Sequence, residues 1–127
     1  MKTIIVDFDG VIHWYRQGWK DGSIYDEPTP GTKEALQELK EIGCKITIFS
    51  TRAFDRITPV KGVKEPSQYL EMIQWLEKYE IPFDEIWQES GKPIGHVYID
   101  DRAIQFRGNW RETIQQTQTF KAWSTNY

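Results

Sequence analysis

The sequence holds only one cysteine and two histidines among its 127 residues, and its formal net charge is −3. The single cysteine, Cys44, forms no internal disulfide, so we expect a reducing, cytoplasmic setting and interpret Cys44 as a small buried hydrophobic residue. Zinc sites are built mainly from cysteine and histidine, and His13 and His96 stand in no such cluster. A negative chain lacks the overall field that attracts nucleic acid, although a local basic patch is not excluded.

The sequence also lacks long apolar runs. The first apolar run, Ile4 to Val6, is too short for a signal peptide, and no segment has the length of a membrane-spanning helix. Hydrophobic residues still make up 39% of the chain and aromatic residues 14%, which is enough for a packed core. We therefore expect residues 1–127 to form a single domain without a membrane segment.

Short apolar segments alternate with segments of helical periodicity. Strands are expected at 2–6, 45–49, 85–87 and 97–99, and helices between 31 and 43, between 67 and 81, and at 110–116. Residues 13–30 are rich in glycine, proline, aromatic and charged residues and are expected to form a loop or small flap, and residues 53–66 a second loop. The alternation predicts an α/β fold, a three-layer Rossmann-like parallel sheet with helices on both faces.

Acidic residues follow two of the expected strands. Asp7 and Asp9 come after the first strand, and Asp100 and Asp101 come directly after the last one. Ligands of parallel sheets bind where the carboxyl ends of the strands meet, so we expect these four carboxylates to lie close together. Such a cluster is self-repelling, and Mg²⁺ relieves the repulsion because it binds carboxylates together with a substrate phosphate. The sequence therefore predicts a magnesium site formed by these residues.

The same carboxylates suit phosphoryl transfer. One carboxylate can attack phosphorus, and another can protonate the leaving group and then activate water. Groups of the turn after the second strand, at Ser50 and Thr51, are expected to bind the phosphoryl oxygens, and the turn at Gly10 belongs to the same site. Arg52 is expected to hold the substrate phosphate through two hydrogen bonds, and Lys92 to balance the charge of the transferred group.

Four segments, in chain order, resemble the motifs of a known family. They are IIVDFDGVI with Asp7 and Asp9, ITIFSTR with Ser50, GKP with Lys92, and VYIDDRA with Asp100 and Asp101. Together they span residues 4–103 and resemble the haloacid dehalogenase (HAD) superfamily of phosphohydrolases. A lone DxD motif is weak, but the ordered set of strand-end motifs is much more specific.

The resemblance implies a role for each acidic residue. Asp7 would be the nucleophile that forms an aspartyl-phosphate, and Asp9 would be the general acid/base, with its backbone carbonyl on Mg²⁺. Asp101 would be the direct metal ligand of the last pair, with Asp100 beside it or acting through water. In the family, an acid at the position of Asp9 goes with phosphatase or phosphotransferase activity instead of dehalogenation.

The resemblance also implies that Ser50 binds the phosphoryl group and that Lys92 stabilises it. Lys92 lies only eight residues before Asp100, a close spacing for this motif. Lys61 and Lys64 are therefore the alternatives for the motif lysine.

Short connections after the first two strands predict a HAD enzyme without a large cap domain, and hence an open site. The Ser-Thr-Arg and Tyr-Ile-Asp-Asp-Arg-Ala runs also resemble the phosphatase domain of polynucleotide kinase-phosphatases. There, the arginine after the hydroxyl residue helps to bind phosphate, which would be the role of Arg52 here.

We therefore predict a Mg²⁺-dependent phosphatase that acts on a phosphate monoester, on a small molecule or on a nucleic-acid end. Two alternatives stay open: a nucleotide or nucleic-acid-end phosphatase, and a non-catalytic phosphate- or protein-binding module of the same fold. The sequence predicts neither the substrate nor the oligomeric state. It also leaves open whether Trp14, Tyr15 and Trp19 of the flap contact substrate or pack onto the body.

Overall fold

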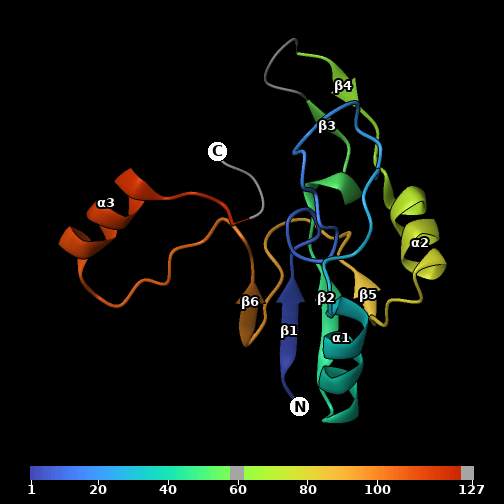
Figure 1. The fold of residues 1–127 in the computed structure, drawn as a ribbon, viewed down its shortest axis with the longest axis horizontal. Helices are drawn as coiled ribbons and strands as arrows, with labels where there is room; N and C mark the ends of the chain where they lie inside the picture. Colours follow the sequence, from blue (N-terminus) through green and yellow to red (C-terminus); the bar gives the residue numbers. More distant parts are fainter. Residues whose placement is uncertain (58–61, 124–127) are drawn as a thin grey trace.

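The structure is a computed structural model that describes residues 1–57 and 62–123. Its elements follow one another along the chain as in Figure 1: β1 (Thr3–Val6), α1 (Thr32–Glu41), β2 (Lys45–Ile48), the 3₁₀ helix η1 (Thr51–Ala53), β3 (Arg56–Ile57), β4 (Lys64–Glu65), α2 (Tyr69–Lys78), β5 (Glu85–Ile86), β6 (Val97–Ile99) and α3 (Trp110–Thr119). Every predicted strand and helix is present, with boundaries that differ by a few residues. The prediction of a mixed α/β fold is therefore confirmed.

The centre of the molecule is a sheet of four parallel strands in the order β5-β2-β1-β6. Val6 at the end of β1 pairs with Ile48 of β2 on one side and with Ile99 of β6 on the other. The three strands therefore end at the same level, and the residues that follow them share one edge of the sheet. This is a Rossmann-like arrangement, with helices beside a parallel sheet.

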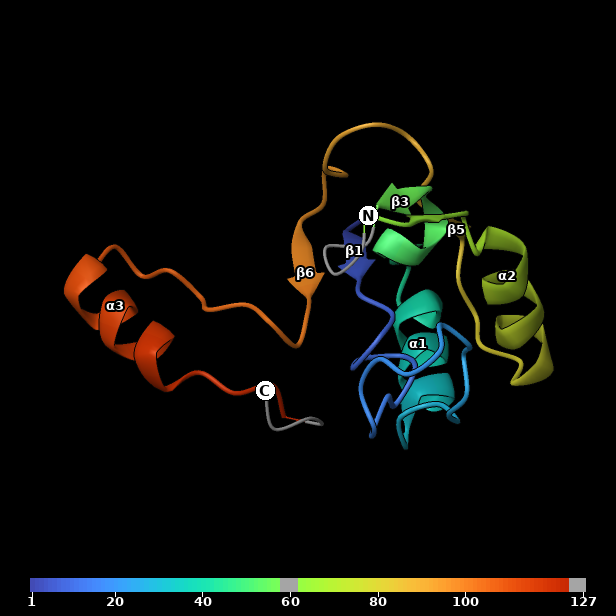
Figure 2. The same ribbon diagram turned by 90° about the horizontal axis from the view of Figure 1, so that it is seen from above.

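Helices α1 and α2 cover one face of this sheet (Figure 2). The core forms between that face and the two helices, from the side chains Ile4, Val6, Ile46, Ile48, Leu36, Met72, Trp75 and Leu76. Ile5 and Thr47 point to the opposite face and are buried as well. Gly95 contacts Ile5 there so closely that a Cβ atom at position 95 would lie 2.4 Å from Ile5 Cγ1. Burial on both faces explains why these strands are continuous β-branched runs.

The second helical layer differs from the prediction. Helix α3 lies beyond β6, apart from the sheet (Figures 1 and 2), and none of its residues is buried. Within the described residues, the face opposite α1 and α2 is crossed by the segment before β6 and not by a helix. Periodicity shows that a segment is helical, but it does not specify the surface on which the helix packs.

The predicted loop at 53–66 contains a short antiparallel pair, β3 with β4. Strands of two residues are too short to show an alternation of polar and apolar side chains in the sequence. The flap at 13–30 has no helix or regular strand, as expected, and is fixed by bridges from His13 to Asp9 and to Pro28. None of the helices in the described parts of the chain has the length and apolar character needed to span a membrane.

Candidate active site

Three carboxylates meet at the carboxyl edge of the sheet. One oxygen each from Asp7, Asp100 and Asp101 lies within 4.8 Å of the others. Their proximity follows from the register, because Val6 and Ile99 are paired neighbours and the acids come directly after them. The Asp7 backbone N–H continues the ladder with a 2.9 Å hydrogen bond to the Ile99 carbonyl. The predicted meeting of the two acidic segments is thus observed for three of the four carboxylates, and Asp9 is not among the three.

The electrostatics of this triad fit a hard divalent cation. Burial, followed by the negative charge of Asp100, raises the pKa of Asp7 from 3.8 to about 8. The Asp101 Oδ1 atom is buried and has no hydrogen-bond partner among the described residues. A buried, unpaired carboxylate oxygen is costly, and Mg²⁺ takes oxygen ligands of this kind. The donor set therefore fits Mg²⁺ and, having no nitrogen or sulfur atom, fits zinc poorly.

Gly10 shapes the same site through its backbone. Its φ of +86° lies in the left-handed region, and a Cβ atom there would lie 2.2 Å from Asp101 Oδ2. Position 10 therefore has room for glycine only while Asp101 keeps its place. The predicted turn at Gly10 is present, and it acts by letting an acidic side chain approach the backbone.

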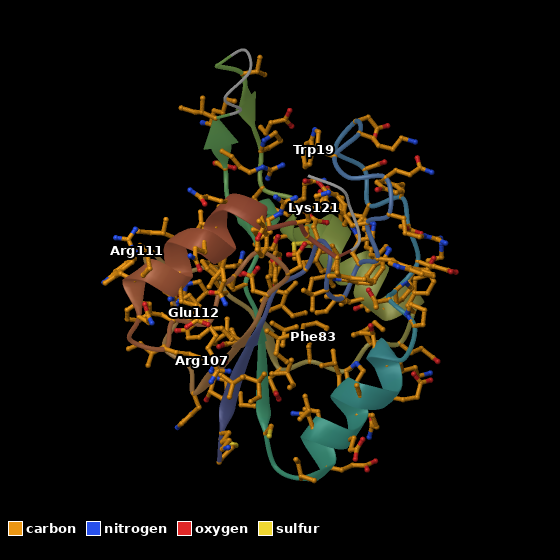
Figure 3. All side chains as sticks on the ribbon, turned by 60° about the vertical axis from the view of Figure 1, so that its left-hand side comes forward. Trp19, Phe83, Arg107, Arg111, Glu112 and Lys121 are labelled. Carbon is orange, nitrogen blue, oxygen red and sulfur yellow. The ribbon has the colours of Figure 1, made fainter. Side chains whose placement is uncertain are left out.

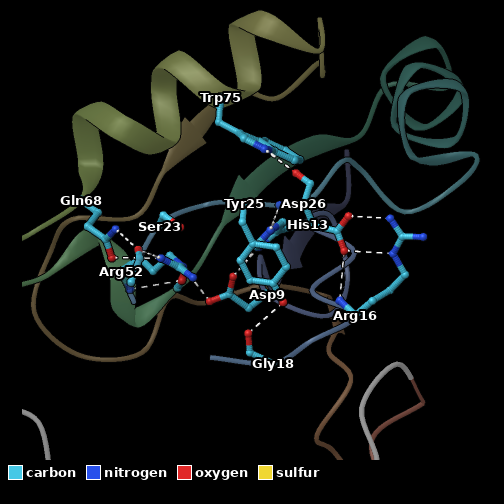
Figure 4. Close-up of polar contacts among 12 residues, drawn as sticks. Asp9, His13, Arg16, Gly18, Ser23, Tyr25, Asp26, Arg52, Gln68 and Trp75 are labelled. Atoms are coloured by element: carbon cyan, nitrogen blue, oxygen red, sulfur yellow. Dashed lines mark hydrogen bonds and ion pairs between the residues drawn. The ribbon is translucent and has the colours of Figure 1, made fainter. Parts of the chain in front are cut away.

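Asp9 is not part of the triad and is held by contacts of its own, which Figure 4 shows. Its Oδ1 atom accepts a hydrogen bond from His13 Nδ1 at 2.8 Å, and its Oδ2 atom accepts one from Arg52 Nε at 2.8 Å. His13 is fully buried, and its Nε2 atom accepts the backbone N–H of Asp26 at 3.1 Å. The imidazole proton therefore sits on Nδ1, facing Asp9.

These contacts determine the charge state of Asp9. Burial on its own raises the pKa of Asp9, but the hydrogen bond from His13 and the charge and hydrogen bond of Arg52 outweigh it. The net result is a pKa below the usual value of 3.8. Asp9 is therefore a carboxylate held ionised and in a fixed orientation beside the triad.

Arg52 is enclosed in the protein and does not line the cavity of the triad. Its side chain is 1% exposed, and one of its terminal nitrogens donates to the Gly22 carbonyl at 2.7 Å and to Gln68 Oε1 at 3.1 Å. The 3₁₀ helix that follows Ser50 turns the arginine into the protein interior, where it joins Asp9 to the flap (Figure 4). The observed contacts make Arg52 a brace for Asp9, and the expectation that it grips the substrate phosphate stays a prediction.

A cavity of about 470 Å³ opens above the triad. Most of the predicted site residues line this cavity, together with residues of the flap and of the strand ends. The lining residues are Asp7, Asp9, Tyr15, Trp19, Phe49, Ser50, Thr51, Asp100, Asp101 and Arg102. Ser50 is buried, and its Oγ atom accepts the Arg52 backbone N–H at 3.2 Å. Thr51 is exposed at the same edge. The structure therefore brings together the acids and the hydroxyl residues that the sequence singled out.

Lys92 is not brought to this cavity. Its ammonium group lies 4.5 Å from the centre of the Tyr98 ring, and it lines a different cavity together with Thr3 and Lys45, the first residues of β1 and β2. Lys92 precedes β6 by several residues and so lies toward the opposite end of that strand. Lys64 is exposed in β4, and Lys61 lies outside the described residues.

Several cavity and support residues were not predicted from the sequence. His13 donates a hydrogen bond to Asp9 and lies four residues after it, a spacing that is visible in the sequence. Trp19 is 46% exposed at the cavity, whereas Tyr15 is buried against His13 and Tyr25. The Trp123 indole N–H donates to the Gly10 carbonyl at 2.7 Å across 113 residues, a contact for which the sequence carries no local signal.

Comparisons with known proteins give a full-length structural match. No protein-family model matches the chain, and no curated protein matches it. The crystal structure of an MCSG target from Vibrio cholerae is similar over 93% of this chain and 98% of that chain, with 29% sequence identity and a TM-score of 0.52. The match supports the α/β architecture over nearly the whole length and carries no statement about activity.

Proposed function

We propose that this chain is a Mg²⁺-dependent phosphatase with a HAD-like fold that hydrolyses a phosphate monoester through an aspartyl-phosphate on Asp7. The observation that carries the proposal is that the acidic residues fall into two groups with different contacts. Asp7 belongs to a triad with a buried, unpartnered oxygen on Asp101, while Asp9 is held apart by His13 and Arg52. One set of carboxylates is suited to a cation, and a separate acid is suited to proton transfer.

Asp7, Asp100 and Asp101 would hold Mg²⁺, which when bound would supply positive charge for the substrate phosphate. A carboxylate oxygen of Asp7 attacks phosphorus, the bond to the leaving oxygen breaks, and that oxygen takes a proton from Asp9. A water molecule then attacks the phosphorus of the aspartyl-phosphate and gives its proton to Asp9. Phosphate leaves, and the Asp7 carboxylate is restored.

The contacts of Asp9 bear on the choice of leaving group. Because the pKa of Asp9 is low, its protonated form is the minor one at neutral pH, and Asp9 is better suited to the base step than to the acid step. Esters whose leaving group needs little protonation, such as aryl phosphates, should therefore react fastest. Ser50 and Thr51, which line the cavity, would bind the phosphoryl oxygens.

The test is hydrolysis of p-nitrophenyl phosphate, sugar phosphates and nucleotides with Mg²⁺, with EDTA, and by the Asp7→Asn variant. Asp55→Asn is the matched control, since Asp55 is exposed and does not line the cavity of the triad. We expect turnover that requires both the metal and Asp7 and that survives in Asp55→Asn. Absence of turnover on every ester would instead support a non-catalytic binding module.

Trp19 favours a nucleotide or nucleic-acid end as the second candidate substrate. Its indole is half-exposed at the cavity, and the Arg52 guanidinium carbon lies 5.0 Å from the ring centre. A base can stack on such a ring for about 1–3 kcal/mol. We expect Trp19→Ala to raise KM for a nucleoside monophosphate or a 3′-phosphorylated oligonucleotide by about tenfold, with kcat nearly unchanged.

Trp14→Ala is the matched control for this prediction, because Trp14 belongs to the same flap but stacks on Arg16 and does not line the cavity. Steady-state kinetics with a sugar phosphate as a second substrate provide the comparison. Equal losses on the nucleotide and on the sugar phosphate would show that Trp19 supports the flap and does not recognise a base.

A further inference from the structure

Residues 102–123, here called the arm, leave the body directly after the acid triad and return to it. At the returning end, Ala122 is 3% exposed and the Trp123 indole N–H is hydrogen-bonded to the Gly10 carbonyl. Between these two ends, α3 lies beyond β6 and apart from the other elements (Figures 1 and 2). The arm is therefore fixed to the body at both ends while its middle projects away from it.

The middle of the arm carries an apolar stripe. Phe106, Trp110 and Ile114, the arm stripe, are spaced four residues apart and are 51%, 70% and 46% exposed. The rings of Phe106 and Trp110 already contact each other, with centroids 4.8 Å apart. Helix α3 has ten residues, and none is buried. Because isolated helices of this length are marginal in water, α3 needs a packing partner.

Strand β6, which lies next to the arm, carries apolar side chains that are partly exposed. Val97 and Ile99, the β6 patch, pair with Ile4 and Val6 and so face the same side of the sheet. Ile4 and Val6 are buried beneath the helical layer, whereas Val97 and Ile99 are each 39% exposed. Strands of parallel sheets are ordinarily covered on both faces. Among the described residues, helix α3 therefore packs on no sheet, and no helix covers this face of β6.

The chain exposes more surface than a compact monomer of its mass. The chain exposes 8592 Å². A compact monomer of 15.1 kDa is expected to expose about 7,100 Å². The surplus of about 1,500 Å² exceeds the roughly 800 Å² that each partner buries in a standard interface. The surface of the whole chain is therefore large enough to leave room for a dimer interface of standard size.

The charge distribution also favours a second copy as the partner. The arm carries one carboxylate, Glu112, and four cationic side chains, so its formal charge is +3 and that of residues 1–101 is −6. Figure 3 shows Arg107, Arg111 and Glu112 along the arm. An arm of this charge is attracted to the acidic body of another copy.

We propose that the chain forms a symmetric dimer in which the arm stripe of each copy packs on the β6 patch of the other. Each copy supplies both surfaces once, so a two-fold axis satisfies all four surfaces together. The dimer does not depend on the proposed phosphatase activity, and either can fail without the other.

Sedimentation velocity tests the assembly. We expect the wild type to have twice the chain mass of 15.1 kDa. Trp110→Ser with Ile114→Ser should raise the dimer dissociation constant by about 100-fold or more, because exposed aromatic anchors dominate such interfaces. The matched control is Leu70→Ser, since Leu70 is 68% exposed in the first turn of α2 and should leave the dimer intact. A monomeric wild type, or a dimer unchanged by the double variant, would overturn the proposal.

Disulfide trapping tests the exchange itself and does not require the serine variants to fold. Val97→Cys and Ile114→Cys are combined with Cys44→Ala, and the oxidised protein is compared with each single-cysteine variant on a non-reducing gel. We expect a covalent dimer that needs both new cysteines. An internally linked monomer would mean that the arm folds back on its own β6, and no cross-link at all would mean that the two surfaces do not meet. Both results contradict the proposal.

Discussion

Asp7→Asn should abolish phosphatase turnover and, in the same protein, raise the thermal stability of the metal-free state. Asparagine cannot form an aspartyl-phosphate, so we expect kcat to fall by at least about 10³-fold. The stability gain arises because burial and the charge of Asp100 raise the pKa of Asp7 from 3.8 to about 8 in the folded protein. Asparagine resembles the neutral acid and does not bear the cost of that shift.

The shift fixes the direction of the pH dependence. Between about pH 4 and pH 8, folded Asp7 keeps a proton that the unfolded chain has released, so the unfolded state binds fewer protons. The stability of the metal-free wild type should therefore fall as pH rises through this window and level off above it. Asp7→Asn should lack this slope, and melting temperatures measured in EDTA at pH 5, 6, 7 and 8 will show the difference.

Magnesium provides the internal control for this prediction. At 100 times its dissociation constant, a bound ion stabilises a protein by about 2.7 kcal/mol. The melting temperature of the wild type should thus rise with Mg²⁺, and that of Asp7→Asn should rise less, while Asp55→Asn behaves like the wild type. Equal pH slopes for Asp7→Asn and the wild type, or a variant less stable than the wild type in EDTA at pH 8, would contradict the proposed state of Asp7.

The acid triad could be predicted because it depends on local signals and one general rule. A β-branched run that ends in Asp7 and another that ends in Asp100 each indicate the end of a strand. Parallel pairing then brings both ends to the same edge without any knowledge of loops. Ser50 and Thr51 were placed by the same reasoning. The four-stranded sheet followed equally from alternation, since each element is short and bounded by glycine, proline or acidic residues.

The parts that were missed depend on contacts between distant segments. Arg52 donates to Gly22, which lies 30 residues earlier, and the direction of its side chain is set by a single 3₁₀ turn. Lys92 lies five residues before its strand, so the family motif gives its order in the chain but not its distance from the acids. The position of α3 depends on which apolar surface it covers, and helical periodicity carries no information on that partner.

Arg52→Met should be among the most destabilising single substitutions in this protein. The buried guanidinium donates to the Asp9 carboxylate and to the Gly22 carbonyl, and its removal leaves Asp9 with His13, and Gly22 with Gln68, as the remaining donors. Breaking a buried ion pair costs about 3–5 kcal/mol, and we expect a loss at the lower end of this range because Asp9 is 22% exposed. Lys33→Met is the matched control, because the Lys33–Glu80 pair is exposed and such pairs contribute about 0–1 kcal/mol. Chemical denaturation of both variants measures the difference.

Arg52→Lys separates the brace seen in the structure from the phosphate clamp that the sequence suggested. Lysine keeps a positive charge but lacks the planar set of donors that reaches Asp9, Gly22 and Gln68 together. If Arg52 is a brace, the free energy of unfolding of Arg52→Lys falls. The pKa of Asp9 then rises because its hydrogen bond with residue 52 weakens, so the acid limb of the pH profile of kcat moves to higher pH. KM then changes little. If Arg52 instead binds substrate phosphate, KM rises sharply and stability stays near that of the wild type. The two outcomes exclude each other, since a side chain enclosed at 1% exposure cannot leave Asp9 to grip a substrate without opening the flap.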